Sequence, residues 1–166
     1  MEYQSNNSSD QNQENYLEKC NSLQEIKLSY KRSIKFEERF KIRESHDIHR
    51  YAKSIWNQDS LEFQESFYVL YLDRQNSVLG WINLAKGGLT QVCVDKKILL
   101  ATALKVLCSS IIILHNHPSG NLKPSQADIN LTNGLLSACN LLDIVLLDHV
   151  IISTEGFFSF ADEGLI

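Results

Sequence analysis

The sequence has few of the residues that interrupt regular structure, with two prolines and seven glycines among 166 residues. This scarcity excludes a proline-rich linker and a low-complexity polymer. An excess of positive charge is also missing, because 16 lysines and arginines face 20 aspartates and glutamates, for a formal net charge of −4. That balance argues against a protein whose main role is to coat nucleic acid. The two prolines, Pro118 and Pro124, lie in one short segment, which singles that segment out.

The chain has no Cys-x-x-Cys pair. Its four cysteines are Cys20, Cys93, Cys108 and Cys139, so interpretations as a zinc ribbon, a zinc finger or a thioredoxin-like protein lose their main support. Four cysteines in a chain of this length are too sparse for a disulfide scaffold, and we expect four reduced thiols. We expect Cys108 and Cys139 to fill helix faces.

Long apolar runs are absent as well. The N-terminus lacks the basic start and apolar stretch of a secretory signal. No segment approaches the ~18–20 apolar residues of a membrane span. We therefore expect a cytoplasmic protein that has no membrane partner.

Composition divides the chain into three parts. Residues 1–24 contain thirteen asparagines, glutamines and serines, which predicts a disordered polar tail. We expect residues 25–44 to form a basic extension that packs on the domain, and residues 45–166 to form the domain itself. Within residues 27–50, eight basic side chains face four acidic ones. We interpret this strip as a solvated strand or loop, and the alternative is a weak contact with nucleic acid or an acidic partner.

Hydrophobic periodicity predicts a mixed sheet between helices, in the α/β or α+β range. The segment 110–114 is short and wholly apolar, which is typical of a strand covered on both faces. Gly134 interrupts the last helix at a cost of ~1 kcal/mol relative to alanine. The expected helices are 45–56, with Ser45 as its cap, 96–108 and 125–142, and the expected strands are 66–73, 78–85, 89–94, 110–114, 144–153 and 156–160.

The apolar strand at 110–114 runs directly into two histidines, His115 and His117. Side chains two positions apart on a strand point to the same side, so both imidazoles can approach one cation. Asp128 follows at the start of the next helix, and a Pro-Ser-Gly turn with a second proline can bring it back over the strand end. Two imidazoles and one carboxylate make a three-ligand zinc site with an open fourth position, which is the catalytic arrangement.

A zinc-bound water has a pKa near 7, and a nearby base must take its proton and pass it to the leaving amine. Glu65, just before a predicted strand, is the expected base, and its neighbour Glu62 is the alternative. Ser125 is a candidate donor to the oxyanion of the tetrahedral intermediate. The alternative role for Ser125 and Asp128 is structural, because Ser-x-x-Asp at a helix start resembles a capping box.

These residues resemble a known pattern. The spacing Glu…His-x-His-x10-Asp, with a serine three residues before the aspartate, is similar to the JAMM motif of MPN/JAB-domain metalloproteases. His-Asn-His-Pro-Ser-Gly followed by Pro-Ser-x-x-Asp resembles the RadC family more narrowly. The resemblance covers roughly residues 25–166 and includes the segments 67–73, 147–152 and 158–165.

The resemblance implies a three-layer, cytidine-deaminase-like α/β/α fold with a mixed sheet. It also implies one Zn²⁺ held by His115, His117 and Asp128, with Glu65 as the base and Ser125 at the oxyanion. The implied function is a zinc-dependent hydrolase that cleaves a peptide or isopeptide bond in an unknown protein or peptide, in a family linked to DNA repair.

Two departures from the family pattern weaken the case for DNA binding. Longer members carry an N-terminal helix-hairpin-helix-type region, in whose place this sequence has a short polar tail. Where many members have Pro-Arg before the middle helix, this chain has Val-Asp-Lys-Lys at 94–97.

Several alternatives stand beside the hydrolase. One is a non-catalytic module stabilised by a metal, and another is a DNA-associated accessory protein that uses residues 27–50. The adjacency of the His-Asn-His letters argues against an HNH nuclease, and the sequence lacks the His-x-Glu and Pro-Cys-x-x-Cys motifs of zinc deaminases. We expect His46 and His49 to be surface residues. Asp148 and His149 either brace the site or satisfy the end of the sheet, and we favour the latter.

Overall fold

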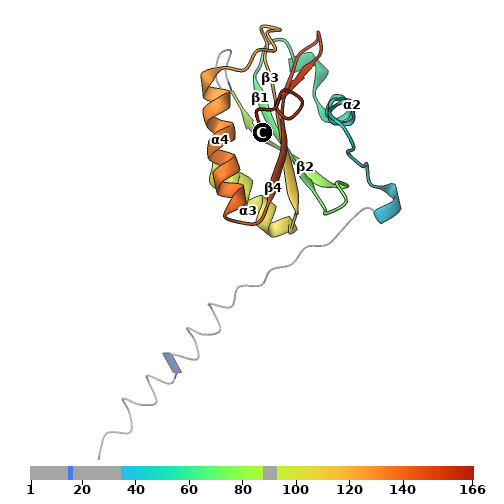
Figure 1. Cartoon of the computed structure of the whole chain (residues 1–166). Coiled ribbons are helices and arrows are strands. Elements are labelled where there is room, and N and C mark those ends of the chain that lie inside the picture. The colour runs from blue at the N-terminus through green and yellow to red at the C-terminus, as the bar shows by residue number, and fades with distance from the viewer. Residues whose placement is uncertain (1–14, 17–34, 88–92) are drawn as a thin grey trace, which may run out of the picture.

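The apolar strand predicted at 110–114 lies at the centre of a five-stranded sheet in the computed structural model, which describes residues 15–16, 35–87 and 93–166 (Figure 1). The strand order is β2-β1-β3-β4-β5. β3 and β4 are parallel, and the other neighbours are antiparallel, so the predicted mixed sheet is confirmed. The strands are β1 (Ser66–Leu72), β2 (Val78–Lys86), β3 (Ser110–Asn116), β4 (Val145–Ile152) and β5 (Phe157–Ser159).

Helices cover both faces of this sheet. One face packs against α2 (Ser45–Ile55), and the opposite face packs against α3 (Lys96–Val106) and α4 (Gln126–Asn140). Figure 1 shows α2 on one side of the strands and α4 on the other. Two short 3-10 helices, η1 (Phe36–Glu38) and η2 (Gln58–Ser60), flank α2 along the chain. The α/β class is therefore confirmed.

The central strands are buried along their whole length, because each face of the sheet has its own apolar core. Every residue of β1 and of β3 is buried. Leu70 and Ile112 pack with the α2 face, whereas Val69 and Ile113 pack with the α3 and α4 face. Alternate residues of one strand thus supply two cores, and this explains why the strand sequences show no polar alternation.

The helix starts show which side chains act as caps. Asp95 accepts backbone N–H bonds at the start of α3, and Ser125 caps α4. The prediction that Ser45 caps α2 is wrong, because Ser45 is the first helical residue and the cap position belongs to Glu44, whose side chain makes no capping bond. Asp47 instead reaches back and accepts the N–H of Arg43 at 3.0 Å.

The strand predicted at 89–94 and the predicted position of Cys108 on a helix face are not confirmed by the structure. The predicted strand lies mostly outside the described residues, and its described residues Cys93 and Val94 have no strand geometry. Cys108 follows the end of α3 and does not sit on a helix face, although it is buried, as is Cys139 on α4. Both are free thiols, as is the exposed Cys93.

The segment before α2 lies against the turn between β1 and β2. The Ile42 N–H donates to Asn76 at 2.9 Å, and the Val78 N–H donates to Phe40 at 2.9 Å. Arg39 forms an ion pair with Asp73 at 3.1 Å. The predicted tail 1–24 falls almost entirely outside the described residues, as do positions 25–34. No described helix is long and apolar enough to span a membrane.

Gly134, inside α4, provides a test of helix propensity. A Cβ at this position would meet the Lys96 Nζ at 2.7 Å, and Nζ is the far end of a flexible side chain that can move. We expect Gly134→Ala to raise the free energy of unfolding by about 0.5–1 kcal/mol in urea denaturation. The control is Gly164→Ala, which should destabilise because its φ is +69°. A loss of stability in Gly134→Ala would contradict this account.

Candidate metal centre

The two predicted histidines stand at the end of β3, with His115 as its second-last residue and His117 directly after it. His115 is 1% exposed and His117 is at the rim, with 17% of its side chain exposed. Their Nε2 atoms lie 2.9 Å apart. The structure therefore brings both imidazoles to one point, because residues two apart on a strand share a side.

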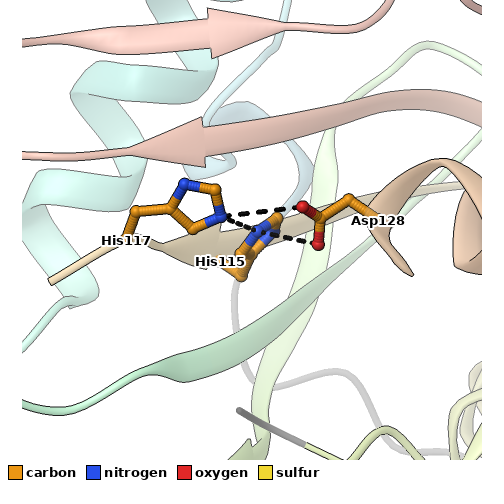
Figure 2. Close-up of side chains that lie close together, drawn as sticks. All are labelled: His115, His117 and Asp128. Carbon is orange, nitrogen blue, oxygen red and sulfur yellow. Dashed lines mark hydrogen bonds and ion pairs between the residues drawn. The ribbon is translucent and has the colours of Figure 1, made fainter. Parts of the chain in front are cut away.

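Asp128 meets them from the first turn of α4. Its Oδ1 lies 3.2 Å from His115 Nε2, and its Oδ2 lies 3.7 Å from His117 Nε2 (Figure 2). The candidate ligand atoms of these three residues all lie within 4.8 Å of one another, a group that could hold a metal ion. Two imidazoles and one carboxylate are a donor set that suits zinc.

A backbone carbonyl orients His117. Its Nδ1 bonds to the carbonyl oxygen of Asn121. A carbonyl only accepts, so Nδ1 carries a proton. Nε2 is left to face His115 and Asp128, with a lone pair when the ring is neutral and a proton for Asp128 when the ring is charged. The neutral ring is the tautomer that can bind a metal through Nε2.

Ser125 and the helix start hold the carboxylate of Asp128. The Ser125 N–H and hydroxyl donate to Oδ2 at 2.7 and 2.6 Å, and the Asp128 N–H donates to the Ser125 hydroxyl at 3.2 Å. The structural alternative, a capping box, is thus present. Burial alone would raise the pKa of Asp128, but hydrogen bonds from His115, His117 and Ser125 hold it well below its usual range. The carboxylate is therefore charged at neutral pH.

A cavity of about 660 Å³ opens beside this group. Glu65 and Ser125 line it together with the three candidate ligands. Glu62 lines a separate hollow, which includes His117 but neither His115 nor Asp128. Burial raises the pKa of Glu65, and the charges of the two histidines oppose that shift. Of the two carboxylates left open by the sequence, Glu65 is the one that faces the candidate metal centre.

Asn116, the residue between the two histidines, has a role that sequence reasoning missed. It is fully buried. Its Oδ1 accepts the Ser66 N–H at 2.7 Å, and its Nδ2 donates to the carbonyls of Leu61 and Gln64 at 2.7 and 3.0 Å. Asn116 thereby ties the loop that carries Glu65 to the strand that carries both histidines. The sequence does contain one signal for this role, because an amide side chain at a buried strand position needs hydrogen-bond partners.

Asp148 and His149 were both expected to satisfy the end of the sheet, and the structure confirms this for only one of them. Asp148 satisfies the end of the sheet, because its carboxylate accepts from the Ser159 hydroxyl at 2.6 Å and the Ala161 N–H at 3.0 Å. For His149 the favoured expectation is wrong. Its ring is fully buried, and its Nε2 lies 2.8 Å from Nδ1 of His115.

The other candidate residues lie apart from this centre. His46 is exposed as expected, whereas His49 is half-buried and its ring centroid lies 4.7 Å from that of Phe157, with the two rings tilted by 33°. In the described part of the basic strip, Arg39 and Arg50 are paired with Asp73 and Asp47. Contact with nucleic acid through residues 27–50 stays a prediction.

The fold and the site together define a class of protein: an α/β domain in which two histidines at the end of the central strand meet an aspartate from the start of the next helix. Residues 42–165 match the family model of the RadC-like JAB domain. The chain therefore belongs to the RadC-like JAB domain family, which confirms the resemblance found in its motifs.

The curated relatives are UPF0758 proteins. The one from Porphyromonas gingivalis is 42% identical over 104 residues, which are 62% of this chain and 46% of the relative. The one from Aquifex aeolicus is 44% identical over 105 residues, covering 63% and 46%. The one from Chlorobaculum parvum is 35% identical over 126 residues, covering 76% and 55%. The chain thus matches about half the length of these relatives.

The contacts of Asn116 generate a stability prediction. Asn116→Asp keeps the shape but turns a carboxylate oxygen toward the carbonyls of Leu61 and Gln64. We expect the free energy of unfolding to fall by about 2–4 kcal/mol in urea denaturation. The control is Asn133→Asp on the exposed side of α4, which makes the same change of charge. An equal effect of both substitutions would show that the buried contacts of Asn116 are unimportant.

The protonation of His117 generates a prediction for metal binding. The hydrogen bond with Asp128 raises the pKa of His117 above 6.5, although burial opposes this. The proton therefore stabilises the metal-free fold below about pH 6.5, and this contribution is lost as the pH rises through the folded-state pKa. Because a metal needs the unprotonated imidazole, zinc binding should release a proton at pH values of 6.5 and below, where His117 is still mostly protonated in the metal-free protein.

Calorimetry in two buffers of different ionisation enthalpy measures that release. We expect zinc affinity to increase with pH until His117 is neutral. Zinc binding with no proton release over this range would contradict the assignment.

Proposed function

We propose that this chain is a zinc-dependent hydrolase that cleaves a peptide or isopeptide bond. The observation that carries the proposal is that one cavity holds His115, His117 and Asp128 together with the carboxylate of Glu65. Three protein ligands beside an open cavity suit a catalytic zinc, whereas structural zinc sites have four protein ligands. When bound, zinc supplies a water that is acidic enough to attack a carbonyl at neutral pH.

Glu65 is proposed as the general base and then the general acid. Its carboxylate lines the cavity, and burial raises its pKa toward the range in which a carboxylate takes up a proton and returns it. In this role Glu65 accepts the proton of the attacking water and delivers it to the leaving amine. Asn116 supports Glu65 by holding the loop 61–66 in place.

Ser125 is proposed to donate a hydrogen bond to the oxyanion. Its hydroxyl donates to Asp128 in the structure, so it would have to rotate toward the substrate in the cavity. The Ser125 N–H would keep its bond to Asp128 during that rotation. The capping role and the catalytic role are therefore compatible.

The proposed substrate is a protein or peptide, and it rests on the similarity of the site to the JAMM arrangement. The cytidine-deaminase-like relationship of the fold belongs to the same proposal. The alternative is a metal-stabilised module without catalytic activity, and Glu65 distinguishes the two because a non-catalytic module does not need a base.

The test compares Glu65→Gln with Glu62→Gln in the zinc-loaded protein. The probe is a set of quenched fluorescent peptides that includes lysine ε-amide bonds, and zinc content is measured in parallel. We expect about one zinc per chain in both variants. We also expect a loss of hydrolysis of about 10²–10⁴-fold in Glu65→Gln and no loss in Glu62→Gln. His115→Ala should lose zinc and activity together.

Hydrolysis unchanged by Glu65→Gln would contradict the role of Glu65. Zinc binding without hydrolysis in the unmodified protein would favour the non-catalytic module. A chain that binds no zinc would contradict both interpretations.

A further inference from the structure

A continuous chain of buried hydrogen bonds runs behind the candidate metal centre. His115 Nδ1 lies 2.8 Å from His149 Nε2, and His149 Nδ1 lies 2.7 Å from the Thr132 hydroxyl. The Thr132 hydroxyl in turn lies 2.7 Å from the carbonyl oxygen of Asp128. The chain therefore begins at one candidate ligand and ends on the backbone of another, and it crosses from β3 through β4 to α4.

The last acceptor determines where the protons lie. The Asp128 carbonyl can only accept, so the single hydroxyl proton of Thr132 points to it. The Thr132 oxygen must then accept from His149, which places a proton on His149 Nδ1.

The next step fixes the tautomer of His115. The His149 ring is fully buried, and among the described residues its nitrogens bond only to Thr132 and His115. A fully buried imidazole between a hydroxyl and a second imidazole has no carboxylate partner to stabilise a charge, so its ring is neutral. With its proton on Nδ1, His149 accepts through Nε2. His115 must therefore donate from Nδ1. Its Nε2, which faces His117 and Asp128, then has a lone pair whenever the ring is neutral and carries a proton for Asp128 only in the charged ring.

We propose that His149 and Thr132 are positioning residues that hold His115 in the tautomer with a free Nε2. The inference rests on the proposed metal function of the site and adds to it the residues that prepare a ligand. The His117 tautomer is set by the carbonyl of Asn121, so His115 is the ligand for which buried side chains do this work. Partners of this kind typically change metal affinity by 10–100-fold when removed.

The alternative is that Thr132 and His149 only fill the core. Substitutions of Thr132 separate this packing role from the positioning role. Thr132→Val keeps the shape and the buried apolar contact but removes the hydroxyl. Thr132→Ser keeps the hydroxyl and loses a methyl group. A packing role predicts that serine is the worse replacement, whereas the positioning role predicts that valine is.

The matched control is Thr102 on α3. Its hydroxyl also bonds the carbonyl four residues earlier, that of Ile98 at 2.8 Å, and it takes no part in the chain from His115. Thr102→Val should leave zinc affinity unchanged. This control separates the loss of a helical threonine bond from the loss of this particular chain.

The experiment measures zinc affinity by competition with a chelator and ring protonation by two-bond ¹H–¹⁵N NMR of histidine-labelled, metal-free protein. We expect zinc affinity to fall about 10–100-fold in Thr132→Val and to stay unchanged in Thr132→Ser. In the unmodified protein, His149 should carry its proton on Nδ1. His115, at a pH where its ring is neutral, should also carry its proton on Nδ1.

Three results would overturn the proposal. One is a proton on Nε2 of His149 in the unmodified protein, which needs no variant to fold. Another is an Nε2–H tautomer of neutral His115, and the third is equal zinc affinity in Thr132→Val and Thr132→Ser. Because the NMR measurement uses metal-free protein, it decides the tautomer even if the protein proves to lack hydrolytic activity.

Discussion

Three Lewis-basic atoms facing one another at the end of β3 are the constraint on which the rest of this structure depends. His115 and His117 present Nε2 atoms 2.9 Å apart, with the Asp128 carboxylate beside them. Without a proton or a metal ion between them, these lone pairs and the negative charge repel. The fold therefore holds these three groups in a position that favours a bound cation. The packing of the surrounding strands and helices offsets the repulsion between them.

Each of these groups is held from behind by rigid structure. β3 is buried along its whole length, and Asp128 belongs to a capping box at the start of α4. The loop with Glu65 is attached through Asn116 to the strand between the histidines. Sites supported by strands and helices keep their geometry better than sites on free loops. The candidate ligands and Glu65 are thus attached to a buried strand and to the start of a helix.

The parts of the site that sequence could predict are those that depend on local periodicity. His115 and His117 share a side because side chains alternate along a strand. Ser125 and Asp128 are three residues apart, and this spacing predicts a capping box at a helix start. The contacts of Asn116 and His149 were not predictable in this way. Asn116 bonds residues 50 or more positions away. His149 reaches His115 only through the parallel register of β3 and β4, in which Ile113 is opposite His149, and no local pattern encodes that register.

X-ray absorption at the zinc edge of the loaded protein tests the central claim most directly. The account predicts one zinc per chain, with two imidazole nitrogens and oxygen ligands at about 2.0–2.2 Å and no sulfur. A sulfur ligand would place the metal on a cysteine such as Cys93, and a zinc with no imidazole ligand would place it elsewhere on the chain. Either result would contradict a metal centre built from His115, His117 and Asp128.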